Sequence, residues 1–133
     1  MPGNTYLLDT NAVVALLQGN QELFEITQSA EWLGLSIISV LEFSGFDKLS
    51  EQDHLLLSHL VARVTVINLA HTNTALISSI TQLRQSKALK LPDAIILASA
   101  AVNQATLVTN DAQLLKFAGS HPQYAARGFQ LNP

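Results

Sequence analysis

Short apolar runs alternate with longer segments of helical pattern along this chain, and that alternation constrains its fold more than any other feature. The runs that read as strands are 6–8, 33–38, 64–69, 105–109 and a last edge strand at 128–131. Helical patterns are expected at 11–17, 21–30, from Ser39, 50–60, from Thr72 or Thr74 to 83, 93–103 and 111–117. Parallel neighbouring strands need crossover connections, which are usually helices. The sequence therefore predicts an α/β fold with three α/β/α layers and a central, mainly parallel sheet of about four to five strands.

Composition limits the classes of protein that fit. The 133 residues suit a single domain spanning 1–133, and 48% hydrophobic against 13% charged residues is enough to bury a core. The apolar content is rich for a lone domain, which suggests a homodimer. There is no cysteine, the N-terminus has no signal-type run, and the apolar stretch 94–102 is far shorter than the roughly 20 residues that span a bilayer. We expect a cytoplasmic protein with no membrane segment.

Four acidic residues stand where ligands bind in folds of this class. Asp9, Glu42 and Asp111 follow predicted strands, and Asp93 opens a predicted helix. Ligand sites in open α/β sheets lie beyond the carboxyl ends of the strands, where helix N-termini also point. We therefore expect these four carboxylates to lie close together and to form the site.

Each acid also has a local structural explanation. Asp9 and Asp111 can cap the helices that follow them, Ser39 and Glu42 fit a capping box, and Asp93 suits the first turn of a helix by ~0.3–1 kcal/mol. Together, however, four neighbouring carboxylates repel one another, and a hard divalent cation relieves that repulsion. Oxygen ligands favour Mg²⁺ or Mn²⁺ over zinc, which prefers cysteine or histidine. The four histidines show no metal-binding spacing, and we expect them to be surface residues or ordinary hydrogen-bond partners; they are His54, His59, His71 and His121.

The order of these motifs resembles that of PIN domains, and the resemblance spans nearly the whole chain. The four motifs that carry it are 7–11 (Leu-Leu-Asp-Thr-Asn), 39–42, 91–96 with Ala98, and 107–111 (Leu-Val-Thr-Asn-Asp). Length, spacing and the closing segment 128–133 are similar to the compact VapC-type toxins of type II toxin-antitoxin systems. One departure is Lys116, which stands before Phe117 where many relatives carry a further acid, so the site is restricted to four acids.

The resemblance implies an Mg²⁺- or Mn²⁺-dependent endoribonuclease that hydrolyses RNA phosphodiester bonds. Asp9, Asp93 and Asp111 are then chiefly metal ligands, and Glu42 is a metal ligand or activates water; a bound metal supplies the activation of water. Asn11 and Thr109 either orient water or phosphate there or bond to local backbone. The family also implies a homodimer that a cognate antitoxin protein inhibits.

The charge distribution leaves RNA binding open. The net charge is −3, but setting aside the four site acids leaves six acids against seven Lys and Arg, a net of +1. Arg84, Lys87 and Lys90 either contact the RNA backbone or belong to a solvated stretch. Large apolar residues, namely Phe24, Trp32 and leucines 55–57, are expected to serve a core or interface rather than base stacking.

Two other functions compete with the ribonuclease. A phosphoryl-transfer domain of the haloacid-dehalogenase kind also places an aspartate after its first strand, but it needs a second acid two residues later, where this chain has Asn11. A PIN-like domain with weak or no catalysis could instead bind RNA or a protein partner.

Overall fold

A computed structural model describes residues 4–132; the expected domain ends, residues 1–3 and Pro133, lie outside the described part. The five strands found in that part are β1 Thr5–Leu8, β2 Trp32–Ser36, β3 Thr65–Ile67, β4 Thr106–Val108 and β5 Ala126–Arg127. The helices are α1 Thr10–Leu17, α2 Gln21–Ser29, α3 Ile37–Ser44, α4 Glu51–Arg63, α5 Thr74–Gln85, α6 Leu91–Val102 and α7 Ala112–Ser120. In this part no helix has the length and apolar content needed to cross a membrane.

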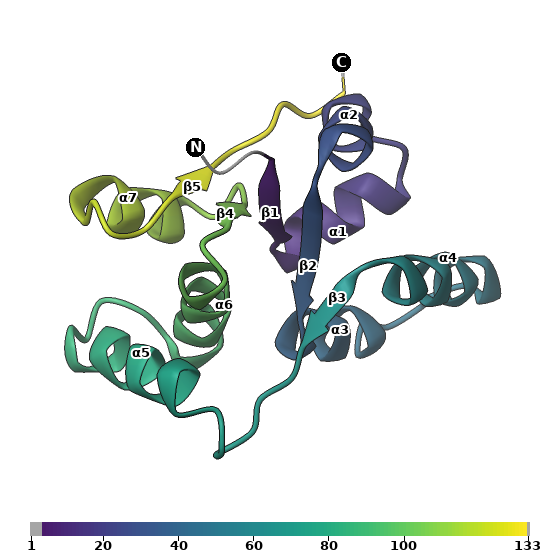
Figure 1. Cartoon of the computed structure of the whole chain (residues 1–133). Coiled ribbons are helices and arrows are strands. Elements are labelled where there is room, and N and C mark those ends of the chain that lie inside the picture. The colour runs from purple at the N-terminus through teal and green to yellow at the C-terminus, as the bar shows by residue number, and fades with distance from the viewer. Residues whose placement is uncertain (1–3, 133) are drawn as a thin grey trace.

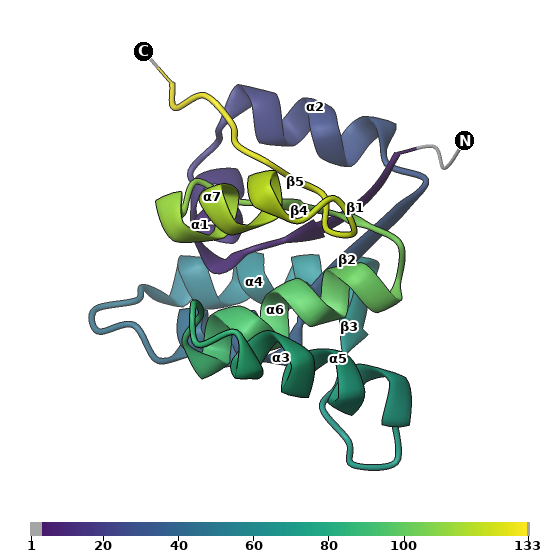
Figure 2. The ribbon, with the colours of Figure 1, turned by 90° about the vertical axis from the view of Figure 1, so that its left-hand side faces the viewer.

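The sheet has the order β3-β2-β1-β4-β5, and every pairing is parallel. Helices α1, α2 and α4 lie on one side of it and α5, α6 and α7 on the other (Figure 1). In the view turned by 90°, α6 lies in front of the sheet, with α7 above it and α5 below it (Figure 2). The predicted three-layer α/β/α fold with a parallel sheet is therefore confirmed.

Successive residues of the central strands enter different halves of the core, as the alternation of a strand requires. Leu7 and Leu107 pack with α5, α6 and α7, whereas Leu8 and Val108 pack with α1, α2 and α4. All four of these side chains are fully buried. Because both faces of the sheet are covered, its strands read as continuous apolar runs, which is why the sequence revealed them.

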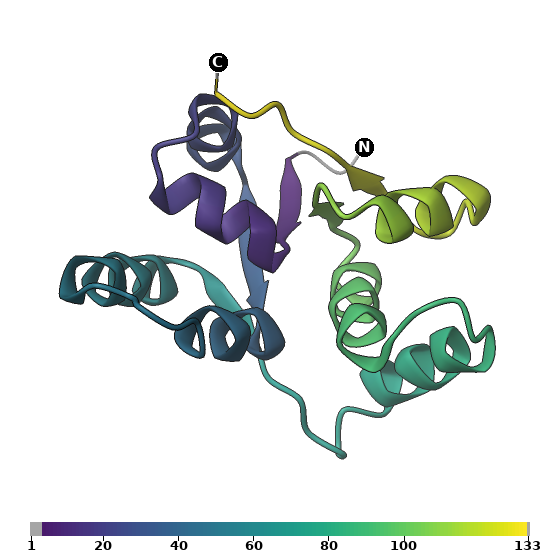
Figure 3. The ribbon, with the colours of Figure 1, turned by 180° about the vertical axis from the view of Figure 1, so that it is seen from behind.

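The chain reverses its direction of travel across the sheet between β1 and β4. It runs outward from β1 through β2 to β3, then crosses to β4 and continues to β5 on the other side. Figure 3 looks onto the carboxyl ends of the strands, where α1, α3, α6 and α7 begin. Such a switch point is where ligands bind in open α/β sheets, and Asp9 and Asp111 follow the two strands that form it.

The predicted cap at Ser39 is wrong. Helix α3 already begins at Ile37, and Ser36 is its N-cap, accepting a hydrogen bond from the Ile38 amide. Strand β2 consequently ends at Ser36 rather than at residue 38. Isoleucines 37 and 38 fit a strand or a helix by pattern alone. The boundary between β2 and α3 is therefore set by which serine, Ser36 or Ser39, caps the helix. The expected capping box between Ser39 and Glu42 does not form, which frees Glu42 for other contacts.

The predicted last strand at 128–131 is also wrong. The strand is Ala126–Arg127, and its register pairs Arg127 with Val108, the last residue of β4. Strand β4 ends at Val108, so it has no further residue with which residues 128–131 could pair. The amide side chain of Asn110 instead bonds both the N–H and the C=O of Phe129. Side chains, rather than a neighbouring strand, therefore hold the segment after β5.

Candidate active site

The four predicted acids line one open pocket of about 480 Å³ at the carboxyl end of the sheet. Each comes from a different segment of the chain: Asp9 from the end of β1, Glu42 from α3, Asp93 from the first turn of α6 and Asp111 from the start of α7. The other lining residues are Thr10, Asn11, Val14 and Phe46. The tertiary structure thus brings together four carboxylates that are up to 102 positions apart in the sequence. We call this hollow the acidic pocket.

Asp9 is the most deeply buried of the four acids, with 5% of its surface exposed. It caps α1 by accepting from the Thr10 amide at 2.8 Å, so the local explanation for this residue holds as well. Its other oxygen accepts from the Thr109 hydroxyl at 2.6 Å and from the Asn11 side-chain amide at 3.2 Å. Burial raises the pKa of Asp9, the bonds from the Thr109 hydroxyl and the Thr10 amide oppose that rise, and the charges of Glu42 and Asp111 add to it.

Asp93 and Asp111 differ in how they are held. Asp93 is half-buried near the start of α6, and burial, followed by the charges of Asp111, Asp9 and Glu42, raises its pKa, while the Lys90 ammonium opposes the rise. Asp111 is the N-cap of α7 and accepts from the Leu114 amide at 3.0 Å. In addition to burial, the charges of Glu42 and Asp111 therefore disfavour the ionised forms of both Asp9 and Asp93.

Glu42 lies in the middle of α3 with an exposed side chain. Its Oε1 accepts from the Thr10 hydroxyl at 2.6 Å, and the same hydroxyl lies 3.1 Å from the Ser39 hydroxyl. The sequence did not single out Thr10 as a partner of Glu42. The signal was present, because Thr10 directly follows Asp9, but only the packing of α1 against α3 reveals the contact.

Asn11 and Thr109, the two predicted supporting residues, contact each other and Asp9. The Asn11 amide donates to the Thr109 hydroxyl at 3.2 Å, and that hydroxyl also accepts from the Asp111 amide at 3.0 Å. Thr109 is completely buried, so its hydroxyl is committed to these partners. Both side chains therefore donate to the same oxygen of Asp9, and Asn11 also lines the acidic pocket.

The donor set fits a hard divalent cation by its chemistry. All four acids offer oxygen ligands, and the mutual repulsion of the carboxylates is what a cation would relieve. As the side chains stand, however, no three Asp, Glu or His residues among 4–132 are close enough to hold an ion together. Ion binding therefore requires the carboxylates to draw inward. The histidines lie elsewhere: three are exposed, and His121 bonds the Phe117 carbonyl and stacks on its ring.

Of the basic residues before Asp93, the Arg84 side chain is used within the fold. Its guanidinium donates to the Leu89 carbonyl at 2.8 Å and so holds the α5–α6 loop, in which Lys87 adopts a left-handed backbone with φ 61°. Lys90 is the nearby cation that acts on Asp93. Among the large apolar residues, Leu57 is buried and Trp32 packs against the core, whereas Phe24 and Leu55 are more than half exposed.

Comparison with known proteins supplies the family. The model of the PIN domain matches residues 6–120, which is most of the chain and includes all four acids. The chain therefore belongs to the PIN domain family. A comparison with curated proteins gave no match.

Solved structures with the same fold include several toxin-antitoxin complexes. A toxin-antitoxin complex from Klebsiella pneumoniae has a chain 25% identical to this one, with a TM-score of 0.71 over 95% of this chain and 97% of that one. VapBC2 from Rickettsia felis bound to a promoter DNA fragment gives 22% identity and a TM-score of 0.70 over 94% and 98% of the two chains. DNA-bound VapBC from Salmonella typhimurium gives 19% identity and a TM-score of 0.72, over 93% of this chain and 97% of that one. The expected likeness to VapC-type PIN domains is confirmed.

Proposed function

We propose that this protein is an Mg²⁺- or Mn²⁺-dependent endoribonuclease and the toxin of a toxin-antitoxin pair. The observation that carries the proposal is the gathering of Asp9, Glu42, Asp93 and Asp111 at the switch point of the sheet. Membership of the PIN family and the toxin-antitoxin complexes among its structural relatives support it. Burial and the neighbouring carboxylates raise the pKa of Asp9 and Asp93, which is a cost to the fold, and such perturbed groups concentrate at functional sites.

In this mechanism Asp9, Asp93 and Asp111 would hold the cation, and Glu42 would either share it or accept a proton from the attacking water. When bound, the cation polarises the phosphate and makes water a better nucleophile. Thr109 and Asn11 keep one oxygen of Asp9 fixed, and the Thr10 hydroxyl does the same for Oε1 of Glu42. The helix N-termini of α6 and α7 favour negative charge, which suits the phosphodiester of the RNA.

The antitoxin partner is inferred from the toxin-antitoxin complexes among the structural relatives together with one surface feature. Leu41 and Phe46 are 61% and 44% exposed, and Phe46 lines the acidic pocket. We propose that Phe46, an exposed apolar side chain at the acidic pocket, contacts the partner. A peptide segment of the antitoxin that covers it would also close the pocket. We further propose that the protein acts as a homodimer in the cytoplasm, in keeping with its apolar content.

The test is cleavage of RNA by the purified protein with Mn²⁺ or Mg²⁺, with EDTA, and with Asp9→Asn or Asp93→Asn. Cleavage that needs the metal and both carboxylates supports the proposal. Cleavage in EDTA, or full activity of both variants, overturns the metal mechanism. If no RNA is cleaved while RNA or a partner protein still binds, the chain is a binding module; covalent phosphate trapped on Asp9 would indicate the haloacid-dehalogenase chemistry instead.

A further inference from the structure

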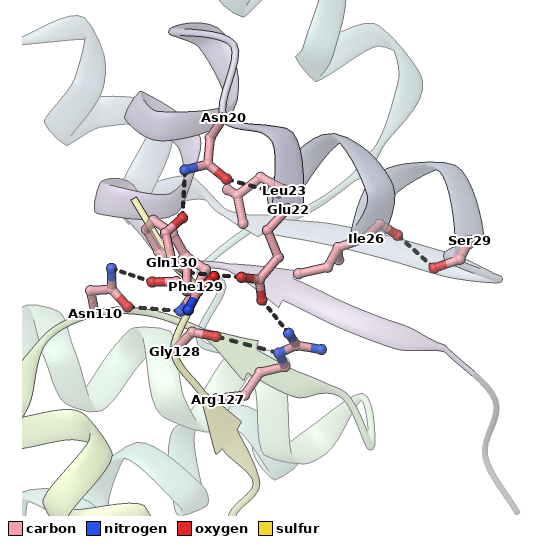
Figure 4. Close-up of polar contacts among 10 residues, drawn as sticks. All are labelled: Asn20, Glu22, Leu23, Ile26, Ser29, Asn110, Arg127, Gly128, Phe129 and Gln130. Carbon is pink, nitrogen blue, oxygen red and sulfur yellow. Dashed lines mark hydrogen bonds and ion pairs between the residues drawn. The ribbon is translucent and has the colours of Figure 1, made fainter. Parts of the chain in front are cut away.

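The segment that follows β5 crosses the molecule and ties two distant connections together. We call residues 128–132 the C-terminal strap. Asn110 holds one end of it, and the start of α2 holds the other. The Asn20 side-chain amide donates to the Gln130 carbonyl at 2.9 Å, and the Glu22 carboxylate accepts from the Gln130 N–H at 2.8 Å (Figure 4). Phe129 is buried in the core beside these contacts. The strap thus joins the start of α2 to the start of α7.

Asn110 meets the strap with both atoms of its side-chain amide. Its Oδ1 accepts from the Phe129 N–H at 2.9 Å, and its Nδ2 donates to the Phe129 carbonyl at 3.0 Å. Such a two-point contact fixes the rotation of the side chain as well as its position. Although Asn110 is exposed, its side chain is therefore held in one orientation.

The backbone of the same residue contacts Asn11, which lines the acidic pocket. The Asn110 N–H donates to Oδ1 of Asn11 at 3.0 Å, and Asn11 uses its Nδ2 on Asp9 and on Thr109. Hydrogen bonds therefore run without interruption from the strap through Asn110 and Asn11 to the most buried carboxylate. Asn11 has a single side-chain oxygen, and the bond from the Asn110 backbone N–H to this oxygen orients the Asn11 side chain.

We propose that Asn110 is a positioning residue for the acidic pocket and that the C-terminal strap holds it in place. It acts through Asn11 and Thr109 on Asp9, and through its own place in the chain on Asp111. This inference rests on the proposed function, because it says how the metal-binding carboxylates are oriented. Residues that orient metal ligands typically change metal affinity by about 10–100-fold when removed, and Asn110 is one contact further out.

The test compares two Asn→Ala variants that each remove two side-chain hydrogen bonds. Asn110→Ala removes both bonds to Phe129, whereas Asn20→Ala removes one bond to the strap and the cap of α2 without touching the acidic pocket. We expect Asn110→Ala to weaken Mn²⁺ binding by about 3–10-fold, measured by calorimetry on the folded variant, and Asn20→Ala to stay within about twofold. Equal effects of the two variants on Mn²⁺ affinity would overturn the proposal.

A second variant reaches Asn110 from the strap. A Cβ on Gly128 would stand 3.0 Å from Oδ1 of Asn110, so Gly128→Ala pushes that side chain without removing it. The expected loss of Mn²⁺ affinity has the same direction and a smaller size.

Amide hydrogen exchange supplies a readout that needs neither metal nor RNA. Asn110→Ala should speed exchange of the Asp111 N–H, which bonds Thr109, while Asn20→Ala leaves it unchanged. Unchanged Asp111 exchange in a folded Asn110→Ala variant would sink the proposal. If the wild-type protein neither binds Mn²⁺ nor cleaves RNA, the proposed function fails, and the exchange experiment still decides the role of Asn110.

Discussion

A hollow of about 480 Å³ lies at each end of the sheet, but one is lined by uncharged residues and the other by acids. The hollow at the amino end lies between β1, β4 and the end of α6, and the described residues that line it, among them Tyr6, Gln104 and Tyr124, include no charged side chain. The acidic pocket at the carboxyl end has four carboxylates in a similar volume.

The fold forms a hollow at each end of the sheet, and the direction of the helices explains why only one of the two hollows is acidic. Helices α1, α3, α6 and α7 begin at the carboxyl end, where caps and first turns favour acids. The same helices finish toward the amino end, where backbone carbonyls collect and a carboxylate gains nothing. Size alone therefore does not identify the site; the placement of charge does.

The largest expected effect is on catalysis. Asp9→Asn, Asp93→Asn or Asp111→Asn should each reduce RNA cleavage by about 10²-fold or more, because each removes one negative ligand of the cation. Gln123→Ala at the amino-end hollow serves as the control and should leave cleavage unchanged. Initial rates with Mn²⁺ measure both. A comparable loss from Gln123→Ala would break the contrast between the two ends.

Glu42→Gln should have a smaller effect that depends on its role. If Glu42 takes the proton from water, the variant loses kcat and the acidic limb of the pH–rate profile changes, while Mn²⁺ affinity is preserved. If Glu42 is chiefly a ligand, Mn²⁺ affinity falls. Thr10→Val removes the hydroxyl that bonds Glu42, so it should lower whichever of kcat and Mn²⁺ affinity Glu42→Gln lowers. Rates and Mn²⁺ affinity that match wild type would exclude Glu42 from the site.

Metal should stabilise the folded chain. A cation that binds only the folded state adds about 2.7 kcal/mol at 100 times its Kd, so the melting temperature should rise with Mn²⁺ concentration. Asp93→Asn should reduce that rise. Thermal melts with Mn²⁺ and with EDTA measure it, and an identical response of wild type and Asp93→Asn would contradict a cation held by Asp93.

The smallest expected effect is on stability without metal. Burial and the neighbouring acids raise the pKa of Asp93, so its charge costs more in the folded than in the unfolded chain. That cost appears as pH rises through the unfolded pKa and is complete above the folded pKa. In EDTA at neutral pH, Asp93→Asn should therefore raise the melting temperature by on the order of one degree, and the gain should vanish at a pH below the unfolded pKa.

The control for this experiment is Asp47→Asn, which changes an exposed acid outside the pocket. It should leave the melting temperature unchanged. A gain that is the same at every pH, or equal in both variants, would argue that repulsion within the pocket is not its source.

Much of the fold followed from local pattern. The strands at β1 and β4 and the helices after them were predicted closely, because buried parallel strands are unbroken apolar runs and Asp9 and Asp111 are helix caps. The errors fell where local pattern was ambiguous. Ser36 rather than Ser39 caps α3, since both serines precede a plausible helix start, and the strand expected at 128–131 could not form once β4 had ended at Val108.

The sequence by itself determined which residues could serve the site, because acids at successive helix starts are visible in one dimension. Only the tertiary structure decided how they are held: Asp9 by Thr109 and Asn11, Glu42 by Thr10, and the start of α7 by Asn110 and the strap. These contacts join residues from 19 to 100 positions apart, apart from the local bond between Asn11 and Asp9. Side-chain hydrogen bonds over such separations depend on how helices pack and carry no local signal, so no reading of pattern could supply them.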